Sequence, residues 1–407
     1  METAGKAQMD NADAGTNDIR MKRNSHIFLL MAAVLALGTG CSKEEPAGNG
    51  GSEIRFSLSP IKVSSKAASS GEEAPLTRAT TSFDQTQVFG SSAYSLPAGK
   101  VWLDDAASSE VFIDKEKISY NNGQWKAWTS GKNYYWKHDN TSLSFLSWYP
   151  YDQLDDGKLG ITDAKEFSYT GWTMTATPGY GYTKDSDGNY VRNTADGSVD
   201  LLLAKSPDRT ENDSANGVLI EFVHQLSNVR VMASIVDDPG TAKWKVTKVE
   251  LSEIYTKANL LKAATTTVNT QIWGGHSDEK TYTYDTSTSP IELVYTSPAT
   301  EVEIFPKTLM LPQSVYTSSS STRSPQITVT CNYTETDASS GPTTTTVKTL
   351  TGVLSNDPAS AAWRAGQSIT YHISISTVDY WIDFDASASG WTEHTWPDGS
   401  GNIIIGE

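Results

Sequence analysis

Cysteine and long hydrophobic runs are scarce in this sequence. Its 407 residues contain two cysteines, Cys41 and Cys331, and its mean hydropathy is −0.41. The most apolar run, IFLLMAAVLAL at residues 27–37, is too short for the roughly 20 residues that cross a bilayer as a helix. The folded part therefore depends on a large hydrophobic core rather than on disulfides, and nothing beyond this run predicts a membrane-spanning segment.

Recognised catalytic and metal-binding patterns are also missing. The six histidines are scattered without metal-ligand spacing, and no GxSxG, HExxH or phosphate-cradling glycine loop occurs. Residues 185–189 (DSDGN) resemble the start of a calcium loop, but the downstream glutamate of an EF-hand is missing, which favours a polar turn. The sequence therefore predicts no enzyme, no cofactor and no metal site. A catalytic pair of carboxylates from distant strands is still an alternative, but no motif in the sequence supports it.

Positive charge is in short supply as well. The formal net charge is −16, from 32 basic and 48 acidic residues. Basic and acidic residues balance over the first 78 positions, so the whole excess lies in residues 79–407. An acidic body disfavours nucleic acid as a partner and helps a secreted protein to stay soluble.

The N-terminal region has the features of a secretory signal. Lys22 and Arg23 precede the apolar run, and the small residues GTG follow it. We assign residues 21–40 to a signal peptide; a short buried helix is the alternative. Residues 1–20 are polar with mixed charge, whereas Met21 opens the chain as a signal peptide should open. Translation then starts at Met21 and residues 1–20 were assigned to the protein in error, or residues 1–20 are a polar extension that export tolerates.

Cys41 lies between the apolar run and a charged segment, as the lipidated cysteine of a lipoprotein does. The motif TGC at residues 39–41 resembles the cleavage site of a bacterial lipoprotein, although Gly38 stands where leucine is usual. Acylation of the Cys41 thiol, as by palmitate, anchors a protein at about 0.8 kcal/mol per buried CH₂. SKEE at residues 42–45 resembles the acidic tag that sends lipoproteins of the Bacteroidetes to the outer surface. Cys331 then has no partner, and its strand-like surroundings predict a small packed side chain.

The rest of the chain consists of short strands and turns. After a flexible tether at residues 41–52, residues 53–59 (EIRFSLS) alternate as a half-buried strand does. Residues 64–75 form a polar, exposed loop. Long helical periods are missing, and turn signals recur about every 8–12 residues. This pattern predicts an all-β fold of two β-sandwich domains, residues 53–236 and 237–407, divided at the turn DDPG.

Two local expectations accompany this fold. Residues 101–103 (VWL) are expected as strand. Most aromatic side chains are expected in the core and in cross-strand pairs, and the alternative is an exposed platform that stacks on sugars. The candidates for such a platform are Trp125, Trp128, Tyr134, Tyr135 and Trp136.

A series of motifs follows the lipoprotein cysteine in a fixed order. They are EIRFSLS (53–59), LTRATTSF (76–83), LSFLSWYPY (143–151), DLLLAKS (200–206), FVHQLSNVRV (222–231), VEIFPKTLMLPQ (302–313), the segment 350–376 that opens LTGVLSN, and FDASASGW (384–391). Together they resemble the fimbrillin family, the FimA/Mfa-like fimbrial subunits of Bacteroidetes.

The resemblance implies two transthyretin-like, Greek-key β-sandwich domains in tandem. It also implies export as a lipoprotein and cleavage by a trypsin-like, Arg-specific protease in a first-domain loop. Here the cut would fall between Arg78 and Ala79 and would free residues 53–78. The removable strand would carry three apolar side chains, Ile54, Phe56 and Leu58. A strand from a neighbouring subunit would fill the groove, as exposed loops favour proteolysis and unpaired strand edges favour strand addition.

Two of these assignments have alternatives. Arg78 is otherwise an ordinary loop arginine. The C-terminal segment NIII is a donor strand or simply a last edge strand; its isoleucines are Ile403, Ile404 and Ile405. At about 3.3 Å per residue it is short for a whole groove, so a complete donor would include the region from Tyr380 onward.

The leading functional hypothesis is a structural fimbrial subunit, displayed on the outer membrane surface and supporting adhesion. Its partners would be other fimbrial subunits, the Arg-specific protease, and the outer membrane through the lipid on Cys41. The second hypothesis is a monomeric surface lipoprotein that binds a glycan or host ligand through exposed aromatic residues. A fimbrial tip adhesin, which cannot donate a strand onward, is the third, and a secreted enzyme is the last.

Overall fold

The computed structural model describes residues 51–59, 85, 87–127, 133–137, 141–151, 158–179, 182–184, 190–192, 200–263, 272–316, 323–335, 344–355, 362–377 and 382–390. All of them belong to one compact unit, Asn49–Glu407. They are almost entirely strands, which confirms the predicted all-β fold of tandem β-sandwiches. Among these residues, none of the helices has the length and apolar character needed to cross a membrane.

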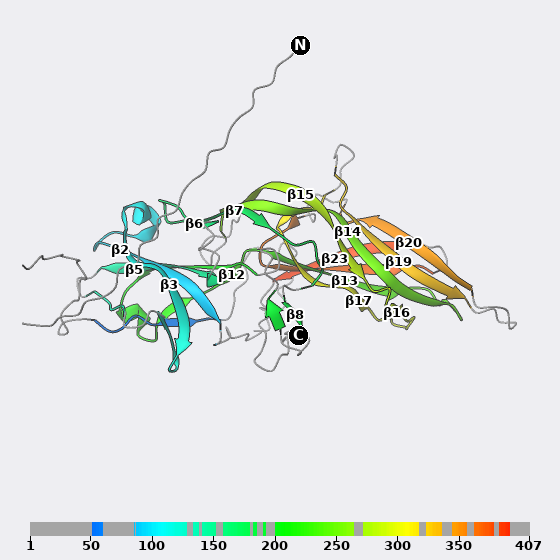
Figure 1. The fold of residues 1–407 in the computed structure, drawn as a ribbon, viewed down its shortest axis with the longest axis horizontal. Coiled ribbons are helices and arrows are strands. Elements are labelled where there is room, and N and C mark those ends of the chain that lie inside the picture. The colour runs from blue at the N-terminus through cyan, green and yellow to red at the C-terminus, as the bar shows by residue number, and fades with distance from the viewer. Residues whose placement is uncertain are drawn as a thin grey trace, which may run out of the picture. The chain divides into compact units, whose positions relative to one another are not determined.

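The first half of the described chain forms an eight-stranded sheet, in which β2, β3 and β5 lie side by side (Figure 1). In spatial order its strands are β11 (Val218–Ile220), β1 (Phe56–Leu58), β4 (Gln124–Ala127), β3 (Glu110–Asn121), β2 (Val88–Leu96), β5 (Ser142–Tyr149), β10 (Leu202–Arg209) and β12 (Val223–His224). The sheet curls so that β10 approaches β11, where the hydroxyl of Ser206 donates to the carbonyl of Leu219, 2.6 Å away.

Two further sheets consist mainly of strands from residue 227 onward, together with β6 and β7. One has the order β17 (Val302–Met310), β13 (Ser227–Ile235), β22 (Gln367–Ile375) and β23 (Ile382–Gly390). The other runs β20 (Thr344–Val353), β19 (Gln326–Glu335), β14 (Lys243–Lys262), β7 (Phe167–Thr173) and β6 (Leu159–Ile161), with β15 (Ile272–Asp285) and β16 (Ile291–Leu293) also paired to β14. Two small pairs are β18 (Gln313–Ser314) with β21 (Ala362–Trp363), and β8 (Tyr182–Lys184) with β9 (Tyr190–Arg192).

Three hydrophobic cores hold these sheets. The first core lies inside the curl of the eight-stranded sheet and contains Phe89 and Phe145. The second core lies between the four-stranded and seven-stranded sheets and contains Val231 and Trp244. Alternation along β22, with every second side chain in the second core, is the pattern of a strand with one buried face.

The third core joins strands of the eight-stranded sheet to strands of the seven-stranded sheet. Trp148 of β5 points away from the first core and packs with Trp172 of β7 and Leu260 of β14. The segment LSFLSWY in β5 is therefore buried on both faces, which explains why it reads as a nearly continuous apolar run rather than as an alternating one.

The turn at residues 237–240 is present, with the Gly240 N–H donating to the Asp238 carboxylate at 2.8 Å. Strand β13 precedes this turn, yet it pairs with β17 and β22, which follow it. The division of the chain into domains 53–236 and 237–407 remains our proposal.

The expectation of a strand at residues 101–103 is wrong. A short helix, α1 (Trp102–Asp105), begins there, and a 3-10 turn (Ala106–Ser108) continues it. The Trp102 N–H donates to the carboxylate of Asp208, at 2.9 and 3.2 Å to its two oxygens. This anion satisfies a free N–H at the helix start, and it lies over a hundred positions away, beyond the reach of a local pattern. A second 3-10 turn spans Asn212–Ser214.

Candidate functional site

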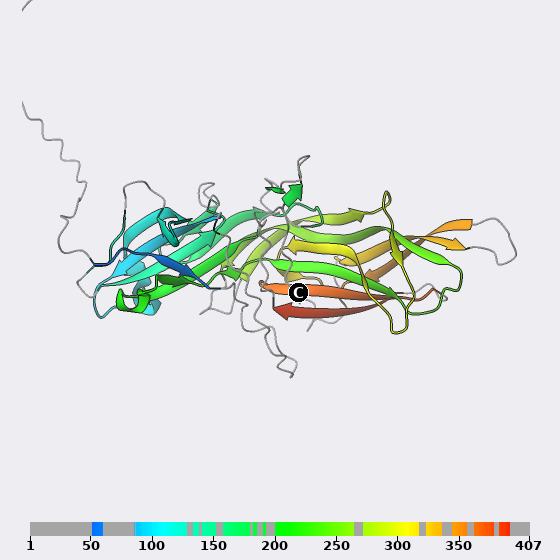
Figure 2. The same ribbon diagram turned by 90° about the horizontal axis from the view of Figure 1, so that it is seen from below.

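The first strand, β1, is enclosed by partners on both sides. It pairs in parallel with β11, Phe56 opposite Val218 and Leu58 opposite Ile220. On its other side Phe56 pairs with Trp125 of β4, in the antiparallel sense. Figure 2 shows this strand, in blue, running along the strands of the first half. We call its surroundings, namely β4, residues 133–137 and residues 217–220, the first-strand seat.

Backbone hydrogen bonds extend this enclosure along residues 52–59. On one side the Ile54 N–H donates to the Tyr134 carbonyl at 2.8 Å, and the Trp136 N–H donates to the Ser52 carbonyl at 3.1 Å. On the other side the Val218 N–H donates to the Arg55 carbonyl at 2.7 Å, and the Ser59 N–H donates to the Ile220 carbonyl at 3.1 Å. Loss of this segment would leave unpaired backbone groups on both flanks.

The apolar side chains of the segment enter the first core. Ile54 and Phe56 are 3% and 5% exposed, and Leu58 packs against the same cluster. The Phe56 ring makes edge-on contacts with Phe89 and Phe145, at centroid distances of 5.9 and 5.7 Å. The three side chains predicted to belong to a removable strand are therefore part of the core, and burial of two such side chains contributes roughly 3–6 kcal/mol.

Polar contacts on the outer side of the segment are weak by comparison. Glu53 forms ion pairs with Lys126 at 3.7 Å and with Arg55 at 3.6 Å. The Arg55 side chain is half exposed, so these pairs are worth about 0–1 kcal/mol each. The strand is held mainly by its ladder hydrogen bonds and by the apolar side chains of its inner face.

Gly217 lets the backbone of β1 approach closely. Its φ is +97°, and a Cβ atom there would lie 2.9 Å from the carbonyl carbon of Phe56 and 3.1 Å from the Ser57 nitrogen. Any larger residue would push against the β1 backbone, in addition to the strain of a positive φ.

The remaining predicted site residues fall outside the described part of the chain. These are the lipidation residue Cys41, the processing residues Arg78 and Ala79, and the donor candidates Ile403, Ile404 and Ile405. Part of the longer donor considered, from Tyr380 onward, is described: β23 pairs with β22 along its whole length, from Gln367 opposite Gly390 to Ile375 opposite Ile382.

The expectation that most aromatic side chains lie in the core is confirmed for Trp125 and Trp136, and the alternative of an exposed platform is wrong for these two. Trp125 and Trp136 are 7% and 4% exposed and belong to the first core. The Tyr134 hydroxyl donates to the Glu116 carboxylate at 2.6 Å, and its ring packs against the same core. Tyr135 is exposed, and Trp128 lies outside the described residues. The alternation of aromatic and polar residues here marks one buried face.

Cys331 is a packed core residue, as predicted. It is fully buried in the second core and has no disulfide. Burial raises the pKa of its thiol to about 12, so the reactive thiolate is scarce at neutral pH.

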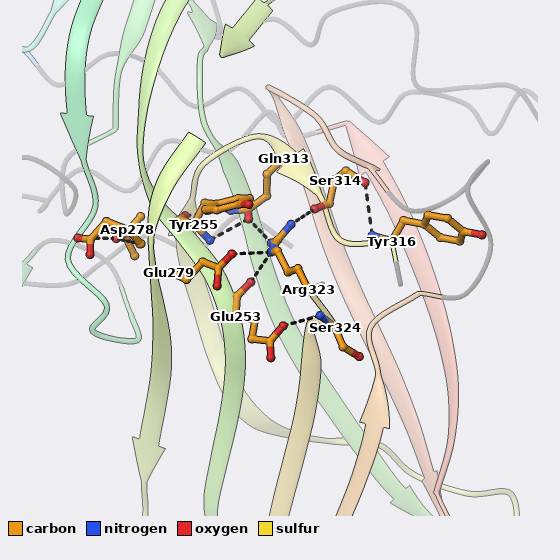
Figure 3. A network of polar contacts seen from close by, with 10 residues as sticks. Glu253, Tyr255, Asp278, Glu279, Gln313, Ser314, Tyr316, Arg323 and Ser324 are labelled. Carbon is orange, nitrogen blue, oxygen red and sulfur yellow. Dashed lines mark hydrogen bonds and ion pairs between the residues drawn. The ribbon is translucent and has the colours of Figure 1, made fainter. Parts of the chain in front are cut away.

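A polar cluster around Arg323 was not predicted (Figure 3). The guanidinium donates to the Glu253 carbonyl, the Ser314 carbonyl and the Gln313 side-chain oxygen, each at 2.7 Å. It also lies over the Tyr255 ring, 4.1 Å from the centroid. The cluster ties the chain ahead of β19 to β14 and β18. Its members come from segments up to 70 positions apart, so no local motif announces it.

These features define the class of protein. It is an all-β protein of tandem sandwiches, in which the first strand pairs with a strand on each side and contributes side chains to the first core. A fimbrillin-like family model matches residues 77–391, and the chain therefore belongs to the fimbrillin-like family. Membership makes it a fimbrial type of subunit, located at the cell surface, that associates with other fimbrial subunits, in a family of structural rather than catalytic proteins.

Solved structures similar to the chain include a putative cell adhesion protein from Bacteroides uniformis, at 14% identity over 83% of this chain and 98% of that one, with a TM-score of 0.39. A fimbrial protein from Bacteroides vulgatus matches at 15% identity over 74% and 92%, TM-score 0.41. The tip fimbrial protein Mfa3 from Porphyromonas gingivalis matches at 9% identity over 75% and 95%, TM-score 0.29. None of the curated proteins matches the chain.

Proposed function

We propose that this chain is a fimbrial subunit that polymerises by proteolysis-triggered strand exchange. The observation that carries the proposal is the first-strand seat, in which β1 is paired on both sides and contributes Ile54 and Phe56 to the first core. A trypsin-like, Arg-specific protease cuts between Arg78 and Ala79. The strand of Ile54, Phe56 and Leu58 then leaves, and a strand from a neighbouring subunit takes its place.

The energetics support replacement rather than simple loss of the strand. An empty seat exposes the apolar walls of the first core, including Phe89 and Phe145, at a cost of several kcal/mol, comparable with the 5–15 kcal/mol that stabilises a whole domain. A donor with alternating apolar side chains restores both the burial and the ladder hydrogen bonds. Ile403, Ile404 and Ile405 form the candidate donor strand, extended by the region from Tyr380 onward.

The proposal extends to location and adhesion. Lipidation of Cys41 anchors the precursor in the outer membrane before cleavage, and the assembled fimbrium supports adhesion to a host or glycan ligand. Burial of Trp125 and Trp136 weighs against the second hypothesis, a monomeric lipoprotein that stacks its aromatic residues on sugars.

A reversible lock on β1 tests strand exchange directly. Ser57 and Leu219 are register partners on adjacent strands, which lie about 4.8 Å apart, within the range that a disulfide bridges. Both side chains point away from the first core. We expect a Ser57→Cys, Leu219→Cys double variant to be cut at Arg78 when oxidised but to remain monomeric, and to assemble after reduction.

The reduced double variant is its own matched control, since only the bond differs. Each single cysteine variant should assemble with or without oxidant. Assembly of the oxidised, locked variant at the rate of its reduced form would refute strand exchange through the first-strand seat.

A further inference from the structure

The outer face of the four-stranded sheet carries a polar cluster that the proposed function does not use. Tyr371 and Ile373 of β22 pack in the second core, so His372 between them lies on the opposite face. Across the strands, Asp385 of β23 is opposite His372 on one side and Met232 of β13 on the other.

His372 has hydrogen-bond partners at both ring nitrogens. Its Nδ1 lies 2.7 and 2.9 Å from the two carboxylate oxygens of Glu301, and its Nε2 lies 2.8 Å from the Ser387 hydroxyl. An ionised carboxylate can only accept, so Nδ1 carries the hydrogen in that contact. In the neutral ring Nε2 is then left to accept the Ser387 proton. A base that is oriented by a carboxylate and bonded to a hydroxyl is the arrangement that activates a serine nucleophile.

The cluster is accessible. The side chains of His372 and Glu301 are 33% and 36% exposed, and Ser387 is exposed on β23, the last strand of this sheet. A substrate can therefore approach the Ser387 oxygen without displacement of core residues.

A hydrogen-bond donor for a developing oxyanion lies in the next row. Thr370 is the register partner of Ser387, which places the two Cβ atoms about 4.5–5.5 Å apart. The Thr370 hydroxyl accepts a hydrogen bond from Arg230 Nε at 2.9 Å, so its own proton can be donated. The guanidinium charge polarises this hydroxyl, which favours donation to an anion.

We propose that Ser387 is the nucleophile of an acyl-transfer site for small carboxylic esters. His372 is the general base, Glu301 is a positioning residue, and Thr370 donates to the oxyanion. The proposal concerns the unassembled chain, in which β23 is paired with β22 along its whole length, so its test does not require strand exchange.

The reaction consists of acylation of Ser387 followed by hydrolysis of the acyl-serine. The Ser387 oxygen bonds to the acyl carbon while its proton passes to His372 Nε2. The ester C–O bond then breaks, and the leaving alkoxide or phenolate takes the proton from Nε2. Water attacks the acyl-serine, gives its proton to Nε2, and the Ser387 oxygen recovers that proton as the carboxylic acid departs. Because the sheet face is open to solvent, activated aryl esters are the expected substrates.

The test uses the purified full chain and two probes, a fluorophosphonate and an aryl acetate. We expect the fluorophosphonate on Ser387, located by peptide mass spectrometry, and slow release of the phenol from the acetate. Ser387→Ala should lose both. His372→Gln should slow both about a hundredfold, the scale of general base catalysis. Ser368→Ala, on the same face of β22 but outside the cluster, is the matched control and should react like the unmodified chain.

Glu301 needs a readout that a merely structural role would not move. Glu301→Ala should slow labelling of Ser387, and Glu301→Asp, which restores a carboxylate acceptor for Nδ1, should recover part of that rate, whereas a merely structural role would leave the rate unchanged in both variants. Absence of the probe from Ser387 in the unmodified chain, or equal acetate hydrolysis by the unmodified chain and Ser387→Ala, would overturn the proposal.

Discussion

Three buried residues in the second core determine how the free energy of unfolding is expected to change at high pH. Cys331, Tyr282 and Tyr371 are all fully or almost fully buried there. Burial raises the pKa of the Cys331 thiol to about 12, and it raises the pKa of both tyrosine hydroxyls. In the unfolded chain these groups ionise near their ordinary pKa values of 9.0 and 10.0.

The sign of the effect follows from these protons. Between pH 9 and 12 the unfolded chain binds fewer protons than the folded chain, so the free energy of unfolding falls as pH rises. Each group contributes a slope of about 1.4 kcal/mol per pH unit once its unfolded form is ionised. We expect the urea midpoint to fall between pH 8 and pH 10.5, and to fall less in Cys331→Ala. An unchanged midpoint over this range would contradict the burial of these groups.

Arg323 is expected to resist the trypsin-like protease that we propose acts at Arg78. A trypsin-like enzyme must bind the guanidinium in its own pocket, but here three hydrogen bonds and the Tyr255 ring hold it, and its side chain is 14% exposed. Three such bonds, at about 1 kcal/mol each, correspond to roughly a hundredfold slower cleavage.

Removal of the Tyr255 ring from the Arg323 cluster should make the peptide bond after Arg323 more accessible to the protease. In Tyr255→Ala we expect faster appearance of peptides that begin at Ser324, measured by mass spectrometry during limited proteolysis. Tyr295→Ala, which removes an aromatic side chain that is 37% exposed, is the control and should leave the rate unchanged. Equal rates in both variants would show that the Tyr255 contact does not protect Arg323.

Among the elements, β1 matters most, because the proposed strand exchange depends on how firmly it is held in the first-strand seat. Gly217→Ala places a Cβ atom 2.9 Å from the β1 backbone and strains a positive φ. Gly99→Ala is a matched control, because Gly99 also has a positive φ, +81°, but nothing lies within 4 Å of its Cβ position. We expect faster hydrogen exchange in residues 52–59 of Gly217→Ala than of Gly99→Ala. Equal exchange rates would mean that Gly217 does not control the fit of β1.

The elements also show what the sequence could and could not predict. The alternation in EIRFSLS located β1 correctly, because one buried face leaves a local trace. Its place between β11 and β4 joins segments that are far apart in the chain, which no local pattern encodes. Residues 101–103 were misassigned for the same reason, since a distant carboxylate of Asp208 caps α1.

The residues of the candidate site also divide into those that a local sequence pattern predicts and those that depend on distant contacts. Ile54, Phe56 and Leu58 were predicted from their spacing, and burial of Cys331 was predicted from its strand-like surroundings. Burial was the expectation for most aromatic side chains and is confirmed for Trp125 and Trp136, but an exposed platform stayed open as an alternative, because an aromatic-rich segment shows the same sequence pattern whether its rings face a core or solvent. The clusters around Arg323 and His372 depend on tertiary contacts alone.

At the scale of the whole molecule, the proposed function combines an anchored precursor with a first strand that is removed. The fimbrillin-like family model covers residues 77–391, and β1 precedes this range while completing the first core inside it. The proposed function therefore requires that the subunit folds as a complete precursor and becomes competent for assembly only when the first strand leaves.

The most direct test is to treat the full chain with a trypsin-like protease, read the new N-terminus by mass spectrometry, and follow the sample by electron microscopy. A clean cut without multimers would identify a tip or anchor subunit instead of a stalk subunit. The account predicts one early cut, a chain that begins at Ala79, and multimers that grow after the segment with β1 is released. A stable monomer that is not cut after Arg78 would contradict it.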